Sequence, residues 1–284
     1  MITALVVLSA LIHATWNGLL RLEADKDRSM VIATVVAALF AFAVAGVRWG
    51  LGEPPFSSWA GVGFAVAAGV FEATYFAALA AAMARGTLGT VYTVSRGGAV
   101  VLVWPLSIAL FAEVATLGAS LGTGLVLIGL VLTGLARRGG GRHDQPGAVR
   151  WALACALAIA GYHLGYKAAL REGIQPSACF AVALGVAAAI NVARMAMRAG
   201  ELGAMRALVG QRWPRLVVIG AICAGSFLLL MEALAVGGSG FVLTLRNTSV
   251  LFALGLSWWI GERPSRRELA GAALVALGAA VMAW

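Results

Sequence analysis

Apolar residues follow one another along this chain in long continuous runs, separated by short segments that carry charges, glycine or proline. A run of about 20 apolar residues allows an α-helix to cross the hydrocarbon core of a bilayer, whereas membrane-spanning strands would show alternation of apolar and polar residues. The pattern therefore predicts an all-α membrane protein. Its ten transmembrane helices are expected over residues 2–20, 31–49, 59–83, 87–111, 116–136, 151–170, 177–197, 214–235, 238–260 and 266–284.

The composition excludes a water-soluble domain, because 61% of the residues are hydrophobic and 12% are charged, against about 45–50% and about 25% in soluble domains. The net charge of +9 lies mostly in the short connections, where it sets topology, so no nucleic-acid partner is expected. Cys155, Cys179 and Cys223 lie singly inside apolar runs. Because their spacing fits neither a disulfide framework nor metal ligands, we expect no metal and no cofactor.

Two halves of the chain resemble each other. A shift of 150 residues superposes His13, Trp16, Asn17, Leu20 and Arg21 on His163, Tyr166, Lys167, Leu170 and Arg171, and Arg96 on Arg246. A shift of 149 superposes Glu113, Gly122 and Gly129 on Glu262, Gly271 and Gly278. This self-similarity predicts two five-helix repeats, residues 1–138 and 151–284, joined by a basic linker at 139–150. Because five is odd, the second repeat must be inverted in the membrane.

Lysine and arginine are distributed unevenly between the two sets of connections. The odd-numbered connections hold fifteen of them: Arg21, Lys26, Arg28, Arg85, Arg137, Arg138, Arg142, Arg150, Arg198, Arg206, Arg212, Arg215, Arg263, Arg266 and Arg267. The even-numbered connections hold two, Arg48 and Arg171. Positive residues favour the cytoplasmic side. We therefore expect the odd connections in the cytoplasm and both termini outside the cytoplasmic (inner) membrane.

Short motifs precede the last predicted helix of each half: Ala112-Glu113 in the first and Gly261-Glu262 in the second, each followed by spaced glycines. With the duplicated halves, these motifs make the chain resemble the drug/metabolite transporter superfamily, as a tandem EamA-type protein. Val70-Phe71-Glu72 and Val103-Trp104-Pro105 resemble elements of the YddG-like aromatic amino acid exporters within it. The two central arginines do not belong to the pattern of that branch. The resemblance implies a carrier that exports amino acids or similar metabolites, not an enzyme.

Ionisable residues lie near the centres of several predicted spans, where each costs about 2.5–3.5 kcal/mol on insertion scales and is expected to face the bundle interior. Helical spacing gathers them with polar and aromatic neighbours on one face of spans one, three, four, six, eight and nine. These spans are predicted to line a central substrate cavity. The candidate substrate-binding residues are His13, Trp16, Asn17, Glu72, Tyr75, Tyr92, Arg96, Tyr162, His163, Tyr166, Arg246 and Asn247.

The buried charges have two interpretations. In the first, Arg96 or Arg246 binds a carboxylate and Glu72 an ammonium of a small-molecule cargo moved by alternating access; in the second, Glu72 and Arg96 only pair with each other. Phosphorylated or nucleotide sugars are the alternative cargo. An intramembrane enzyme with Ser239, in Gly237-Gly238-Ser239-Gly240, as nucleophile is the alternative of another class. As a carrier, the protein is expected to work as a monomer among membrane lipids.

Overall fold

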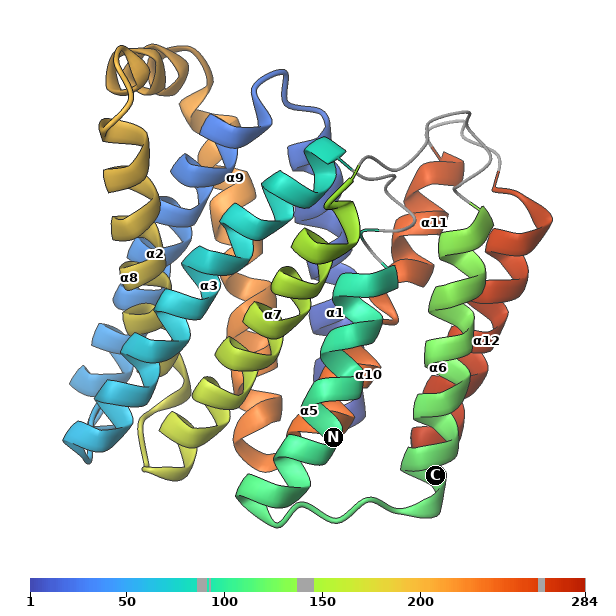
Figure 1. Cartoon of the computed structure of the whole chain (residues 1–284). Helices are drawn as coiled ribbons and strands as arrows, with labels where there is room; N and C mark the ends of the chain where they lie inside the picture. Colours follow the sequence, from blue (N-terminus) through green and yellow to red (C-terminus); the bar gives the residue numbers. More distant parts are fainter. Residues whose placement is uncertain (86–90, 92, 137–145, 260–263, 284) are drawn as a thin grey trace.

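The structure, a computed structural model, describes residues 1–85, 91, 93–136, 146–259 and 264–283 (Figure 1). Its helices are α1 (Ile2–Arg21), α2 (Lys26–Gly50), α3 (Trp59–Arg85), the π-helix η1 (Thr93–Gly97), α5 (Gly98–Phe111), α6 (Leu117–Ala136), α7 (Ala148–Arg171), α8 (Pro176–Ala196), α9 (Glu201–Val236), α10 (Ser239–Arg246), α11 (Ser249–Trp259) and α12 (Arg266–Ala283). No strand occurs among the described residues, so the all-α prediction is confirmed for them.

Nine segments within the described ranges are long and apolar enough to cross a membrane, η1 being counted with α5 and α10 with α11. The tenth predicted span, α12, is not one of the nine, because its 18 residues include Arg266, Arg267 and Glu268, whereas each of the nine contains a stretch of 18 residues with at most two charged residues. Ser265 and Glu268 form a capping box at its start: the Ser265 backbone N–H donates to the Glu268 carboxylate (2.8 Å), and the Glu268 N–H donates to the Ser265 hydroxyl (3.3 Å). A multi-pass membrane protein follows, while the count of ten stays a prediction.

Two helices begin earlier than predicted. The N-terminus of α2 lies at Lys26 rather than 31, because the Asp25 side chain caps it by accepting from the Arg28 N–H (3.1 Å). Likewise α9 begins at Glu201 rather than 214 and is interrupted by the non-helical Arg212 (φ −132°) just before Pro214. Proline is tolerated in the first turn of a helix but not in its interior, which accounts for the kink. The polar residues of 201–213 hid this helical segment from a search for apolar runs.

The predicted span 238–260 is two helices, α10 and α11, rather than one. Near the break, the Thr244 hydroxyl donates to the Gly240 carbonyl (2.8 Å) and the Asn247 amide to the Leu243 carbonyl (3.2 Å). Such side-chain bonds to the preceding turn compete with regular helix geometry. The first-half span predicted at 87–111 is irregular as well, since η1 precedes α5, and its residues 87–90 and 92 lie outside the described ones.

Eight spans form a closed ring, in which each helix packs against the next in the order α1, α9, α2, α8, α3, α7, η1/α5, α10/α11 and back to α1. The α3–α7 contact is close because Gly161 faces the Phe71 ring and Gly165 faces Ala68; a Cβ on Gly165 would lie 3.1 Å from the Ala68 Cβ. The ring leaves a space at its centre, toward which a face of each helix is turned.

Helices α6 and α12 stand beside this ring and pack along each other (Figure 1). A Cβ on Gly129 would lie 2.6 Å from the Gly271 carbonyl oxygen, and a Cβ on Gly278 would lie 2.6 Å from that of Gly122. Only glycine allows two backbones to approach so closely. These two helices supply none of the cavity-lining residues, so they act as a scaffold beside the ring.

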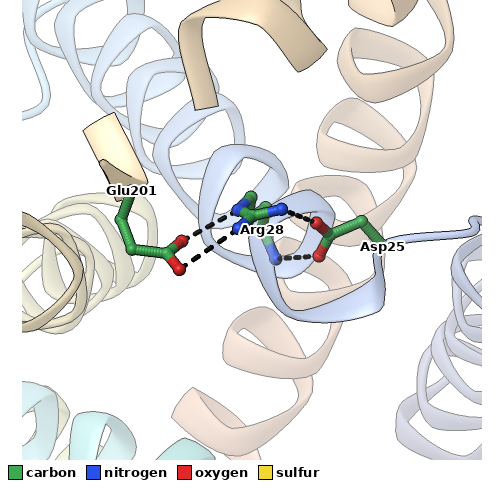
Figure 2. Close-up of polar contacts among 3 residues, drawn as sticks. All are labelled: Asp25, Arg28 and Glu201. Carbon is green, nitrogen blue, oxygen red and sulfur yellow. Dashed lines mark hydrogen bonds and ion pairs between the residues drawn. The ribbon is translucent and has the colours of Figure 1, made fainter. Parts of the chain in front are cut away.

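Ionic contacts link the halves at both ends of α2. At one end the Arg28 guanidinium contacts Asp25 and donates to Glu201 of α9 (Nε to Oε2, 2.8 Å), as Figure 2 shows. At the other end Arg48 pairs with Glu232 of α9. Such partly exposed pairs contribute about 0–1 kcal/mol each to stability. These ion pairs therefore add little to stability, and they set the register of α2 against α9.

Candidate substrate cavity

The centre of the ring is a cavity of about 70 Å³. All eight ring positions contribute lining residues, and these come from the middle of the helices and from the end that bears the odd connections. The lining comprises His13, Trp16, Met30, Ala33, Thr34, Glu72, Tyr75, Phe76, Leu79, Ser95, Arg96, Ala99, Ile159, Tyr162, Leu184, Cys223, Phe227, Leu243, Arg246 and Asn247. Its mixed apolar and polar lining is typical of small-molecule sites.

Arg246 reaches the cavity from the last turn of α10 and is 7% exposed. Its guanidinium donates to the Ser9 hydroxyl (3.0 Å), contacts His13 Nδ1 (3.0 Å) and lies 4.4 Å from the centroid of the Phe227 ring. A planar guanidinium suits this combination of hydrogen bonds with ring stacking, which a lysine ammonium could not reproduce. Arg246 takes part in no ion pair among the described residues.

Arg96 lies in η1, on the same side of the cavity. One of its guanidinium nitrogens donates to the Ser249 hydroxyl (3.1 Å), and another lies 3.4 Å from His13 Nε2. A π-turn is rare and occurs frequently at functional sites, because it shifts the side chains that follow relative to those before it. Here it carries Ser95 and Arg96, both of which line the cavity. His13 thus lies between two guanidinium groups, one from each half of the chain.

Glu72 brings the opposite charge into the same cavity from the middle of α3. Its carboxylate accepts a hydrogen bond from the Tyr166 hydroxyl (2.8 Å) and takes part in no ion pair within the described ranges. Around it Tyr75 and Tyr162 lie with ring centroids 6.0 Å apart, and Tyr162 and Tyr166 with centroids 5.6 Å apart. An acidic group flanked by aromatic faces is suited to a cation. The expected alternative, a Glu72–Arg96 pair, is not seen.

The polar residues of α7 behave differently from those of α1. His163 is fully buried and its Nε2 lies 3.1 Å from the Ser239 carbonyl oxygen, while the Lys167 ammonium donates to the carbonyls of Leu234 (2.8 Å) and Gly237 (2.7 Å). These contacts fasten α7 to the connection between α9 and α10. From the loop after α5, Glu113 accepts from the Ser239 N–H (2.8 Å) and so caps the start of α10.

The twelve predicted site residues divide into those that line the cavity and those that do not. Eight of the twelve line one cavity: His13, Trp16, Glu72, Tyr75, Arg96, Tyr162, Arg246 and Asn247. Asn17, His163 and Tyr166 do not line it, and Tyr92 lies outside the described residues. Asn17 donates to the His13 carbonyl of its own helix (2.8 Å), and Tyr166 lies behind Glu72. Whether any of them contacts a cargo stays a prediction.

The structure adds lining residues that the sequence search missed. Helices α2 and α8 contribute Met30, Thr34 and Leu184, although only six spans were expected to line the cavity. Phe227 stacks on Arg246 and Ser249 binds Arg96. None of these carries a charge, so a search for buried ionisable groups has no signal for them. Their part in the cavity follows only from which helices are neighbours.

Ser239, the candidate nucleophile of the enzyme alternative, is buried at the start of α10. His163 contacts its carbonyl oxygen and not its hydroxyl, whose oxygen has no hydrogen-bond partner among the described residues. A serine nucleophile needs a base within hydrogen-bond reach of its hydroxyl. The arrangement required for this chemistry is therefore not assembled there.

The described helices are those of a multi-pass membrane protein, and they enclose a central polar cavity. Residues 147–284 match the family described as the EamA-like transporter family, which places an EamA-like domain in the second half of the chain and supports the drug/metabolite transporter superfamily. A comparison with curated proteins finds no match. A solved structure titled "Crystal structure of protein" is similar over 99% of this chain and 98% of its own, with a TM-score of 0.75 and 17% identity. At that identity the likeness concerns the fold alone.

Proposed function

We propose that the protein is a secondary carrier of the drug/metabolite transporter type that exports amino acids or similar small metabolites across the cytoplasmic membrane. The observation that carries the proposal is the presence of both charge signs in one cavity, with Arg96 and Arg246 near His13 and Glu72 among tyrosines. Buried charges that do not neutralise one another favour a ligand that supplies both signs. A zwitterionic amino acid does so, and its side chain would lie against Tyr75, Phe76 and Phe227.

The difference between the two ends of the cavity supports transport by alternating access. The end near the α9–α10 connection is packed by Lys167, His163 and Glu113, while the lining residues extend toward the opposite end. Moving a cargo through requires those contacts to open and the other end to close. The packing pairs support the inverted repeat that such rocking uses: α1 packs on α9 as α7 packs on α3, and α2 on α9 as α8 on α3. Because one chain encloses the cavity, a monomer suffices.

Orientation belongs to the same proposal. Both termini lie at the end of the molecule where α5 connects to α6, and the connection from α8 to α9 lies at the other end (Figure 1). The excess of arginine and lysine in the odd connections assigns that other end to the cytoplasm. A single cysteine introduced within 137–150 should resist an impermeant thiol reagent in intact cells, and one at Gly52 should react. The reverse pattern would overturn the orientation.

The cargo alternative is an organic anion such as a phosphorylated or nucleotide sugar. Two guanidiniums against one carboxylate give the cavity an excess of positive charge, which favours this alternative. Counterflow in liposomes that contain only the purified protein tests both, with labelled amino acids, phosphosugars and small cations offered in parallel and protein-free liposomes as the control. Amino acid exchange is expected. Exchange of phosphosugars alone would favour the alternative, and exchange of cations alone would contradict both.

A further inference from the structure

The hydrogen bonds of His13 determine which of its ring nitrogens carries the proton. Two groups point at Nδ1: the Trp16 indole N–H (3.1 Å) and a guanidinium nitrogen of Arg246 (3.0 Å). Indole and guanidinium nitrogens can only donate hydrogen bonds. Nδ1 must therefore be an unprotonated acceptor that the two donors share. A neutral imidazole carries one proton, so this proton is on Nε2.

This tautomer places two donors against each other. His13 Nε2–H faces a guanidinium nitrogen of Arg96 at 3.4 Å, and neither can accept from the other. Two donors so close can both reach one oxygen atom that lies to the side of the line between them, each at about 2.8 Å. A carboxylate oxygen can accept both bonds and would also offset the two arginine charges beside the ring. His13 lines the same cavity as Arg96 and Arg246.

We propose that His13 is a specificity-determining residue whose Nε2–H, together with Arg96, binds one oxygen of the cargo carboxylate. The inference rests on the proposed function, since it presumes a carboxylate cargo, and deepens it by assigning the anion to one edge of one ring. Trp16 and Arg246 act on the opposite edge, where they keep Nδ1 unprotonated and so direct the proton toward the cargo. Trp16 and Arg246 are in this sense positioning residues for the His13 donor.

The two edges can be removed one at a time. In His13→Asn the side-chain amide can place its oxygen near the site of Nδ1, which keeps the acceptor for Trp16 and Arg246 but removes the donor at the Nε2 edge. In His13→Gln the amide nitrogen can reach the Nε2 edge and replace that donor. The probes are L-phenylalanine and L-phenylalaninamide, which keeps the amine and replaces the carboxylate by an uncharged amide, compared in counterflow. We expect His13→Asn to lower the affinity for L-phenylalanine by about tenfold or more, as for a lost hydrogen bond to a charged group. Its affinity for L-phenylalaninamide should stay within about threefold of that of the wild-type protein.

His13→Gln should bind L-phenylalanine more tightly than His13→Asn does. The opposite order would show that only the Nδ1 acceptor matters and would overturn the inference. Nitrogen-15 NMR of histidine-labelled protein tests the tautomer without relying on transport, with the signals of His13 identified by their loss in His13→Asn. A proton on Nε2 is expected, and a proton on Nδ1 would overturn the inference.

The failure of this inference differs from the failure of the proposed function. If L-phenylalanine exchanges in the wild-type protein and His13→Asn exchanges it with unchanged affinity, the anion subsite is wrong while the carrier function stands. If no amino acid exchanges in the wild-type protein, the proposed function is contradicted. In that case the protonated ring nitrogen observed by NMR still decides the assignment of the tautomer.

Discussion

His13 and His163 are superposed when the sequences of the two predicted repeats are aligned, yet their surroundings differ. His13 lines the central cavity and lies between Arg96 and Arg246, whereas His163 is fully buried and contacts the carbonyl oxygen of Ser239. The residues beside them differ in the same way. Trp16 donates to the neighbouring ring within α1, and Lys167 reaches across to the carbonyls that end α9.

The comparison teaches that a repeated sequence pattern reproduces a position on a helix but not the role of the side chain there. The role depends on which backbone the neighbouring helix presents. On α7 the neighbouring segment is the turn between α9 and α10, whose free carbonyls and N–H groups need partners. On α1 the neighbours are two guanidinium groups. We therefore expect the α1 stripe to govern cargo affinity and the α7 stripe to govern stability.

The largest effect is expected from Arg246→Lys, on the cavity side of this comparison. Lysine keeps the charge but loses the pair of contacts to Ser9 and His13 and the stacking on Phe227. Counterflow of L-phenylalanine should fall by about 10–100-fold, the effect of losing a hydrogen bond to a charged group. Arg28→Lys, in the ionic contact of Figure 2, is the matched control and should transport normally. Equal loss in both variants would indicate a general effect on folding.

Lys167→Met should have its effect on stability. It removes two hydrogen bonds to buried carbonyls and leaves those carbonyls unsatisfied, which costs about 2–3 kcal/mol. Thermal unfolding in detergent should show a lower Tm, while the half-saturating concentration of cargo stays within about threefold of wild type. Arg150→Met, at the exposed start of the same helix, is the control. An altered cargo preference with an unchanged Tm would show that Lys167 contributes to cargo binding rather than to stability.

Trp16→Phe should have a smaller effect on cargo affinity, and it tests the role of a single hydrogen bond to His13. Phenylalanine preserves the aromatic ring of Trp16 but lacks the N–H that donates to His13 Nδ1. The loss of one neutral hydrogen bond of about 1 kcal/mol corresponds to about a fivefold loss of carboxylate affinity. Competition by L-phenylalanine in counterflow measures it. Unchanged affinity would mean that Trp16 does not orient the His13 ring.

Asn17→Ala should have the smallest effect of the four. The Asn17 amide bonds a carbonyl of its own helix and does not line the cavity. A change at such a position typically alters stability by within about 0.5 kcal/mol, and cargo affinity should stay within about twofold. A tenfold loss of affinity, measured in the same counterflow assay, would show that the polar face of α1 extends further into the site than the cavity lining indicates.

The helical fold could be predicted from the sequence because each span is an apolar run of sufficient length, and eight of the predicted site residues meet in one cavity because buried charge forces them inward. The helical segment before Pro214 could not be found in this way, since Glu201, Arg206, Gln211 and Arg212 interrupt its apolar residues. The different roles of His13 and His163 could not be predicted from the sequence either. Their neighbours along the chain are alike, and only the tertiary contacts with Arg246 and Ser239 distinguish them.

The central claim is that side chains of opposite charge in one cavity bind the carboxylate and the amine of the cargo. The most direct test compares two ligands that differ only in the amine. L-phenylalanine and 3-phenylpropionate are offered as competitors of labelled L-phenylalanine in counterflow by wild type and Glu72→Gln, with Glu232→Gln, whose carboxylate pairs with Arg48 outside the cavity, as the control. Glu72→Gln should lower the affinity for L-phenylalanine by about tenfold or more. The affinity for 3-phenylpropionate should stay unchanged or increase. Equal weakening of both ligands, or of neither, would contradict the claim.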